Sequence, residues 1–202
     1  EMISTKFIKK SKLPIFIILL IPSFLWSYQF IVGDLGVNPI EKLMDKLGEM
    51  ALRLIVLTLF ISSLADFKNL RSLIEVRRMI GLFAFYYVCL HFLSYIILDH
   101  FFDINFIIQD IIKRPFITFG FLSFVFLIPL ASTSTKQMVK RIGYKSWKKI
   151  HYLIYPAAIL SSFHFFMLVR ANKIEPAIYI GLIFLLLGYR IYIRLIYPLL
   201  YR

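Results

Sequence analysis

The sequence is poor in cysteine, in acidic residues and in charged residues as a whole. Its 202 residues include one cysteine, Cys89, and 11 Asp and Glu, and charged residues make up 17% of the chain against 60% hydrophobic residues. A lone cysteine excludes an internal disulfide and a multi-cysteine metal site. Because a soluble domain of this size needs many more polar side chains to cover its surface, the composition indicates a membrane-embedded protein.

Long apolar runs dominate the chain. Short alternating strands of about ten residues, typical of membrane β-barrels, do not occur in the sequence. Six runs instead approach the length of about 20 residues with which a helix crosses a bilayer. They cover about 14–32, 47–65, 79–98, 115–132, 147–169 and 175–197. We therefore predict an all-α integral membrane protein, one domain over 1–202 built as a six-transmembrane-helix bundle. The stretch 103–113 predicts a further short interfacial helix.

Positive charge is distributed unevenly between the predicted loops. Of the 24 Lys and Arg, 17 fall in the N-terminal tail, the loops after helices two and four, and the C-terminal end, whereas six fall in the opposite loops. The positive-inside rule therefore predicts that both termini are cytoplasmic. The net charge of +13 is a topology signal that also attracts anionic membrane lipid; it forms no basic, aromatic-interleaved stripe for nucleic acid. The predicted docking face for a basic partner on the other side contains Asp34, Glu41, Asp45, Asp103 and Asp110.

Three histidines lie within predicted spans, where ionisable residues are functional candidates. His91 is in helix three, and His151 and His164 are in helix five. Counted from Arg78 and Lys149, His91 and His164 lie about 20 and 22 Å from the cytoplasmic boundary. Two imidazoles at matching depth on separate helices can supply both axial ligands of one haem iron. Such an iron has no open position, which favours electron transfer over oxygen chemistry.

His151 differs from the other two. It lies near the cytoplasmic boundary, about 20 Å along the helix from His164, a spacing that suits a second haem. The residues of helix three at the corresponding depth are Arg77 and Arg78, and arginine is a poor iron ligand because it stays protonated. Pro156 between the histidines can change the helix phase. Three interpretations stay open: ligand of a second haem, contact to another cofactor such as flavin, or an interfacial histidine.

Other polar residues in or near the spans are secondary candidates. His100 is predicted to be solvated or paired with the adjacent Asp99. Arg53, in the outer half of helix two, is predicted either to hold a haem propionate or to reach back to Glu49 one turn earlier. Further candidate cofactor contacts are Arg77, Arg78 and Trp147.

A series of short motifs occurs in the order found in one known family. The motifs are GDLGVNPIE, RRMIGL, LHFLSY, KRPFITFG, TSTKQM, WKKIHYLIY and HFFMLVR. From about residue 30 to 170 the chain resembles the MsrQ family, the haem-binding membrane subunits of MsrPQ methionine-sulfoxide reductase systems, within the wider ferric-reductase-like transmembrane group.

The resemblance implies a haem b protein of the bacterial inner membrane that passes electrons to MsrP, a periplasmic molybdopterin enzyme that reduces methionine sulfoxide. It further implies the quinone pool or a cytoplasmic flavin reductase as donor, FMN as a further cofactor, and functional roles for His91, His151 and His164. Compared with the wider group, helix three has one haem histidine instead of two, and no FAD/NADPH domain follows helix six. We therefore expect one complete bis-histidine haem, electrons from another protein or from quinol, and no substrate-converting site.

Two alternative functions keep the same fold. A stand-alone ferric or metal-ion reductase would share the haem and pass electrons to an external metal ion. A transporter or assembly protein would place the histidines along a proton path and would bind no haem.

Overall fold

The computed structural model describes residues 5–193 and residue Tyr197, and this part of the chain is helical without strands. In chain order the elements are α1 (Thr5–Ile31), α2 (Pro39–Leu64), the 3-10 helix η1 (Lys68–Leu73), α3 (Ile74–Ser94), the π-helical turn η2 (Tyr95–Asp99), α4 (Ile104–Lys113), α5 (Pro115–Ser132), α6 (Lys136–Ile142), α7 (Tyr144–His151), α8 (Ile154–Leu168) and α9 (Ile174–Ile191). Six stretches are long and apolar enough to cross a membrane, which confirms the predicted six-helix architecture. The short helix predicted at 103–113 is α4.

Most spanning helices extend beyond the predicted apolar runs. The fourth run coincides with α5, but α1, α2 and α3 begin 9, 8 and 5 residues earlier than predicted. Hydropathy marks only the part of a helix inside lipid, whereas the helical backbone continues into the polar interface. Pro39 opens α2 at the first helical turn, where its missing N–H leaves no bond unmade. The predicted end of helix six includes 194–196, which lie outside the described residues.

The fifth predicted helix is divided into two. α7 ends at His151 and α8 begins at Ile154, and the two intervening N–H groups donate to carbonyls three residues earlier at 3.2 and 3.0 Å. Pro156 explains the break, because its ring lacks an N–H and would collide with the carbonyl four residues earlier, that of Tyr152. His151 and His164 therefore lie on separate helices, and the change of helix phase that Pro156 allows is present between them.

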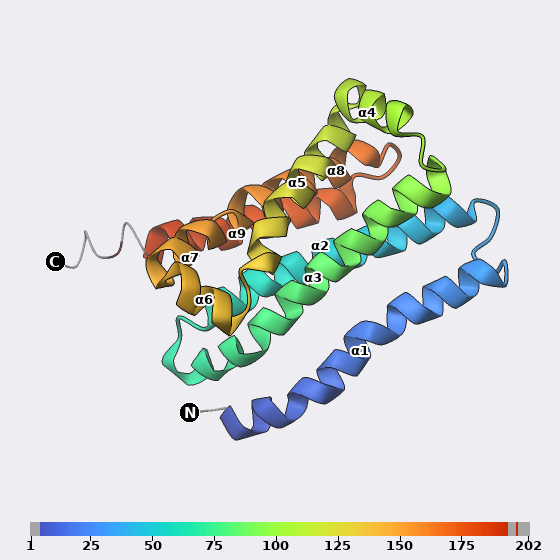
Figure 1. Ribbon diagram of the computed structural model, residues 1–202. Helices are drawn as coiled ribbons and strands as arrows, with labels where there is room; N and C mark the ends of the chain where they lie inside the picture. Colours follow the sequence, from blue (N-terminus) through green and yellow to red (C-terminus); the bar gives the residue numbers. More distant parts are fainter. Residues whose placement is uncertain (1–4, 194–196, 198–202) are drawn as a thin grey trace.

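The helices pack as two hairpin-like pairs with the remaining helices around them (Figure 1). α2 packs along α3, and α5 packs along α8. α9 contacts α8 and α2, while α1 lies on the outer side of α2 and α3. The large side chains most deeply buried in this bundle include Tyr87, Ile55, Leu59 and Ile183. These side chains come from α2, α3 and α9, and their burial fixes the packing of these helices in the bundle.

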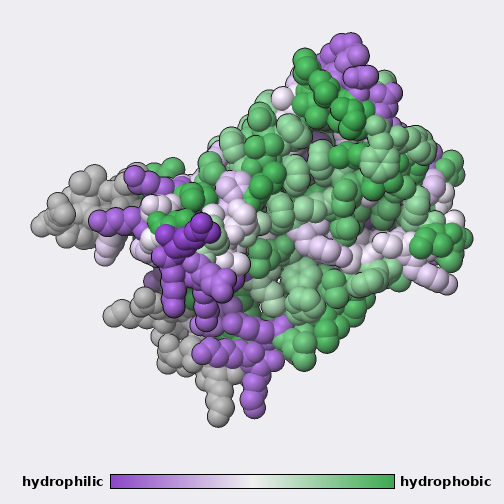
Figure 2. All heavy atoms as spheres, viewed as in Figure 1, coloured by the Kyte–Doolittle hydropathy of each residue, from purple (hydrophilic) through white to green (hydrophobic). Residues whose placement is uncertain are grey.

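The surface divides into an apolar belt and two polar ends (Figure 2). The start of α1, the connection between α2 and α3, and the helices α6 and α7 lie at one end, while α4 lies at the other (Figure 1). Large exposed apolar side chains such as Ile18, Phe24 and Leu185 lie between the ends, as lipid contact requires. The loops therefore fall into the two groups predicted from their charge.

One residue of the predicted acidic docking face is not available for docking. Asp110 is buried with 7% of its surface exposed. Its carboxylate accepts hydrogen bonds from Arg114 Nη1 at 3.0 Å and from the Tyr95 hydroxyl at 3.1 Å. The prediction for Asp110 was wrong because its position in α4 turns it toward the bundle. Asp34, Glu41, Asp45 and Asp103 are exposed.

A buried arginine joins three spanning helices near the end of α9. Arg190 is only 8% exposed and donates to the Tyr155 hydroxyl on α8 at 2.9 Å. It also reaches the Ser63 hydroxyl and the Leu59 carbonyl of α2, both at 3.5 Å. Within the described residues Arg190 has no carboxylate partner. The last turns of α2 supply partial negative charge in its place, because the carbonyls at a helix C-terminus carry it.

Replacing Arg190 with methionine is expected to destabilise the bundle by about 1–3 kcal/mol, the cost of leaving buried partners without a hydrogen bond. The measurement is thermal unfolding of the purified protein in detergent, with Arg170→Met, at an exposed position, as the control. Equal unfolding temperatures for the two variants would contradict the role of Arg190 in joining the helices.

Candidate functional site

Two of the three membrane histidines meet inside the bundle. The rings of His91 on α3 and His164 on α8 have centroids 6.2 Å apart and planes inclined at 77°. The predicted matching depth is therefore present, although 73 positions of sequence separate the two residues. At this level of the bundle the α2–α3 pair packs against the α5–α8 pair.

Each histidine is held by a backbone carbonyl of the neighbouring helix. His91 Nδ1 lies 2.9 Å from the Met44 carbonyl oxygen of α2, and His164 Nδ1 lies 2.7 Å from the Phe116 carbonyl oxygen of α5. A carbonyl can only accept, so Nδ1 must carry the proton and donate in both rings. The lone pair of each imidazole is then on Nε2, which makes no hydrogen bond within the described part of the chain. This is the arrangement of histidines that bind a metal, with the other nitrogen oriented by a carbonyl.

Two glycines allow this close approach. A Cβ on Gly48 would lie 3.1 Å from His91 Nδ1, and a Cβ on Gly120 would lie 2.9 Å from His164 Nδ1. Each glycine stands four residues after the carbonyl that accepts from the histidine, on the same face of its helix. The imidazole therefore lies directly on helix backbone that carries no side chain.

The sequence interpretation missed these glycines. The available signal was a glycine inside an apolar helix, which costs about 1 kcal/mol relative to alanine and often marks a close contact between membrane helices.

The two helix pairs repeat the same unit. Gly48 precedes His91 by 43 residues, and Gly120 precedes His164 by 44 residues. In both cases the first helix supplies the glycine and carbonyl, and the second supplies the imidazole. No repeat is evident in the sequence, because lipid-facing positions of the two pairs need only be apolar. The site is therefore built where two structurally equivalent halves face each other.

The separation of the rings fits one metal ion between them. Two metal–nitrogen bonds of about 2 Å place the nitrogens about 4 Å apart, and half a ring on each side brings the centroids to about 6 Å. The described residues contain no group of three or more His, Cys, Asp and Glu that could hold a metal ion. His91 and His164 are therefore the residues that would hold a metal here, and a planar ring with four nitrogens, as in haem, would supply the remaining ligands.

His100 belongs to a separate network at the α4 end. Its Nε2 lies 3.5 Å from Asp99 Oδ2 and 3.7 Å from Asp110 Oδ2, and its ring packs against Tyr95 with centroids 4.4 Å apart. The predicted pairing with Asp99 is thus present, although both separations are longer than a hydrogen bond. The structure does not bring His100 to the histidine pair.

Arg53 joins α2 to α9. Its guanidinium is 2.9 Å from Glu49 and 3.7 Å from Glu175, and it donates to the Tyr179 hydroxyl at 3.1 Å. Five residues at about 100° each place Arg53 some 140° around α2 from Gly48. It therefore faces α9 and makes the contact to Glu49 that was one of its two predicted interpretations.

The remaining candidates lie near the other end of the bundle. His151 Nδ1 donates to the Trp147 carbonyl at 3.1 Å, and the two rings have centroids 4.0 Å apart and planes inclined at 33°. Trp147 Nε1 is buried and has no hydrogen-bond partner among the described residues. The charge of Arg77 acts on the His151 ring, whereas Arg78 lines a groove between α1 and α3. His151, Trp147 and Arg77 therefore form a second polar cluster, separate from the histidine pair.

The chain is similar to proteins of one known family. Residues 47–162 match the family described as ferric reductase like transmembrane component. A protein-methionine-sulfoxide reductase heme-binding subunit MsrQ from Rhodospirillum rubrum is 44% identical over 180 residues, 89% of this chain and 86% of the relative. The proteins of the same name from Caulobacter vibrioides and Herminiimonas arsenicoxydans are 47% identical (77% of this chain, 73% of the relative) and 42% identical (88% and 83%). The chain belongs to the MsrQ family.

Membership of the MsrQ family confirms the resemblance drawn from the ordered motifs. The matched region runs from α2 into α8 and contains Gly48, His91, Gly120 and His151; His164 lies two residues beyond it. In the first helix pair, Gly48 and His91 thus fall inside the family match, whereas Met44, which supplies the carbonyl, lies three residues before it.

Proposed function

We propose that this protein is a haem b electron-transfer subunit of the bacterial inner membrane, with both termini in the cytoplasm. It takes electrons from the quinone pool or from a cytoplasmic flavin reductase. It passes them outward to a periplasmic molybdopterin methionine-sulfoxide reductase of the MsrP type, for repair of oxidised periplasmic proteins. The relatives' names, which describe a heme-binding subunit of a protein-methionine-sulfoxide reductase, support this assignment.

The observation that carries the proposal is the facing pair of His91 and His164. Both Nδ1 protons are committed to carbonyls at 2.9 and 2.7 Å, which leaves both Nε2 lone pairs for one iron. Haem b held in this way supplies one-electron redox chemistry. With both imidazoles holding the haem, the site would carry electrons and would not bind a substrate at the metal.

The protein's own residues keep the site rigid while electrons pass. The Met44 and Phe116 carbonyls fix the ring orientation, and hydrogen bonds of this kind raise ligand basicity. Gly48 and Gly120 keep each ring against its helix. A rigid site needs little rearrangement between its two oxidation states, which is what rapid electron transfer requires.

The polar cluster at the other end is the proposed position of a second cofactor contact. The Trp147 and His151 rings have centroids 4.0 Å apart and planes inclined at 33°, and the buried Trp147 Nε1 is a donor without a described acceptor. Together with Arg77 these groups suit a planar anionic cofactor such as FMN. In this proposal His151 contacts that cofactor on the side that receives electrons.

The test is visible spectroscopy followed by electron delivery. The purified protein is expected to show a Soret band that shifts on reduction with dithionite. Mixed with an MsrP-type enzyme and methionine sulfoxide, the reduced protein should reoxidise with two electrons, the content of two reduced haems, consumed for each sulfoxide, because R₂SO + 2e⁻ + 2H⁺ gives R₂S + H₂O.

Two controls make this test decisive. An MsrP preparation without its molybdopterin should leave the protein reduced. A preparation that stays colourless after reconstitution with haem would overturn the proposal. Reoxidation by ferric ion but not by MsrP would instead assign the protein as a metal-ion reductase.

A further inference from the structure

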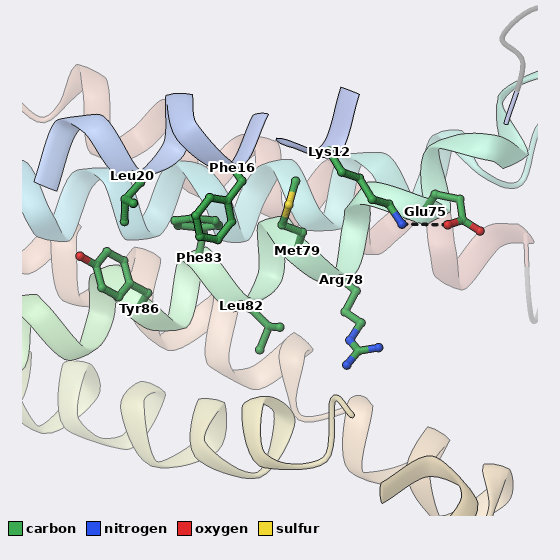
Figure 3. Close-up of a pocket in the computed structure, with 9 residues that line it drawn as sticks. All are labelled: Lys12, Phe16, Leu20, Glu75, Arg78, Met79, Leu82, Phe83 and Tyr86. Atoms are coloured by element: carbon green, nitrogen blue, oxygen red, sulfur yellow. Dashed lines mark hydrogen bonds and ion pairs between the residues drawn. The ribbon is translucent and has the colours of Figure 1, made fainter. Parts of the chain in front are cut away.

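A groove separates α1 from α3 on the side of the bundle away from α5 and α8. It has a volume of about 510 Å³, within the range of small-molecule binding sites. Its walls are mainly apolar side chains of the two helices, and Phe16 and Phe83 meet edge-to-face at its centre with ring centroids 5.1 Å apart (Figure 3). Leu82 lines the groove and is 37% exposed. An apolar chain lying in this groove would bury apolar surface from both helices.

One end of the groove is basic. Lys12 pairs with Glu75 at 2.9 Å (Figure 3), and the charges of Lys9 and Lys136 also act on Glu75. Arg78 points away from this pair (Figure 3) and makes no hydrogen bond or ion pair with any described residue. Three cations, Lys12, Lys9 and Lys136, therefore act on one carboxylate, and the guanidinium of Arg78 is available to an anion.

The opposite end offers no unused hydroxyl hydrogen. The Tyr86 hydroxyl donates to Ser23 Oγ at 3.0 Å, and the Ser23 hydroxyl donates to the Leu20 carbonyl at 2.7 Å. A neutral head group such as a quinone needs hydrogen-bond donors at its oxygens, and here the donors are already used. Arg78 therefore favours a negatively charged group at the basic end, and the apolar side chains beyond it favour hydrocarbon.

We propose that this groove binds an anionic phospholipid, with the phosphate at the basic end that Lys12 and Arg78 line and an acyl chain along Phe16, Leu82 and Phe83. The basic end lies at the start of α1, the end of the bundle that carries the excess of Lys and Arg. The groove therefore opens to the leaflet whose surface is predicted to be cytoplasmic and negatively charged. This inference goes beyond electron transfer and does not depend on it.

The experiment measures lipid retained by the full-length protein in detergent by native mass spectrometry. Phosphatidylglycerol is compared with phosphatidylcholine of the same acyl chains. The unmodified protein should retain phosphatidylglycerol selectively, and the double variant Lys12→Gln/Arg78→Gln should retain it about 25-fold more weakly, the effect of two basic contacts of about 1 kcal/mol each. Leu82→Trp, which fills the groove without changing charge, should also reduce retention.

The matched control is Arg141→Gln/Lys145→Gln, which removes the same charge from exposed positions of α6 and α7. This variant should retain phosphatidylglycerol as the unmodified protein does. Equal losses in the two double variants, or equal retention of the two lipids, would reduce the effect to general surface attraction and overturn the proposal. Displacement of phosphatidylglycerol by a short-chain ubiquinone at equimolar amounts would reassign the groove to a quinone and also overturn it.

Discussion

Replacing either His91 or His164 with alanine is expected to abolish the haem spectrum of the purified protein. In the proposed site both imidazoles would hold the haem, so removal of either would leave it with one protein ligand. The variants should lose the Soret band on purification, or show a five-coordinate, high-spin spectrum if haem is retained through one ligand. The measurement is the dithionite-reduced minus oxidised spectrum, normalised to protein.

His100→Ala is the control for this prediction. His100 is a histidine of the same bundle, but its contacts are Asp99, Asp110 and Tyr95 at the α4 end. The His100 variant should keep the full haem signal. Loss of haem in His100→Ala together with its retention in His164→Ala would show that the facing pair is not the ligand set. Circular dichroism of all variants separates loss of haem from loss of fold.

Replacing Gly120 with alanine is expected to weaken haem binding by about 10- to 100-fold, the range for changes that disturb the orientation of a metal-binding histidine. A Cβ at this position would lie 2.9 Å from His164 Nδ1, closer than side chains pack. The ring must then move from the Phe116 carbonyl, from which it is now 2.7 Å away. Haem titration into the apoprotein and the reduction potential of the bound haem both report the change.

Substitutions of two further glycines provide comparisons for the effect of Gly120→Ala on haem binding. At Gly48 the corresponding distance to His91 Nδ1 is 3.1 Å, so Gly48→Ala should weaken haem binding less than Gly120→Ala. At Gly181, inside α9, a Cβ would meet nothing within 4 Å, and Gly181→Ala should leave haem binding unchanged while stabilising the helix by up to about 1 kcal/mol. If Gly120→Ala bound haem as tightly as Gly181→Ala, the glycines would have no part in positioning the ligands.

The polar clusters show where sequence reasoning was effective and where it was not. Depth along a helix is one-dimensional, with about 1.5 Å for each residue, so the sequence could place His91 and His164 at one level and His151 at another. The number of residues along a helix does not show which way a side chain points around the helix axis or which helix lies next to it. For this reason Arg53 was left with two interpretations, and Asp110 was expected on a surface that it does not reach.

The sequence by itself determined the class of the protein, the six spans, the short helix α4 and the three histidines worth examining. It could do so because hydrocarbon excludes polar groups strongly enough to mark spans in composition alone. Only the tertiary structure decided that the rings of His91 and His164 lie with centroids 6.2 Å apart and that Gly48 and Gly120 lie against them. It also decided that Arg78 lines the groove between α1 and α3, away from the histidine pair. Those facts depend on how helices far apart in the chain pack against one another, and in a uniformly apolar sequence the packing leaves almost no local signal.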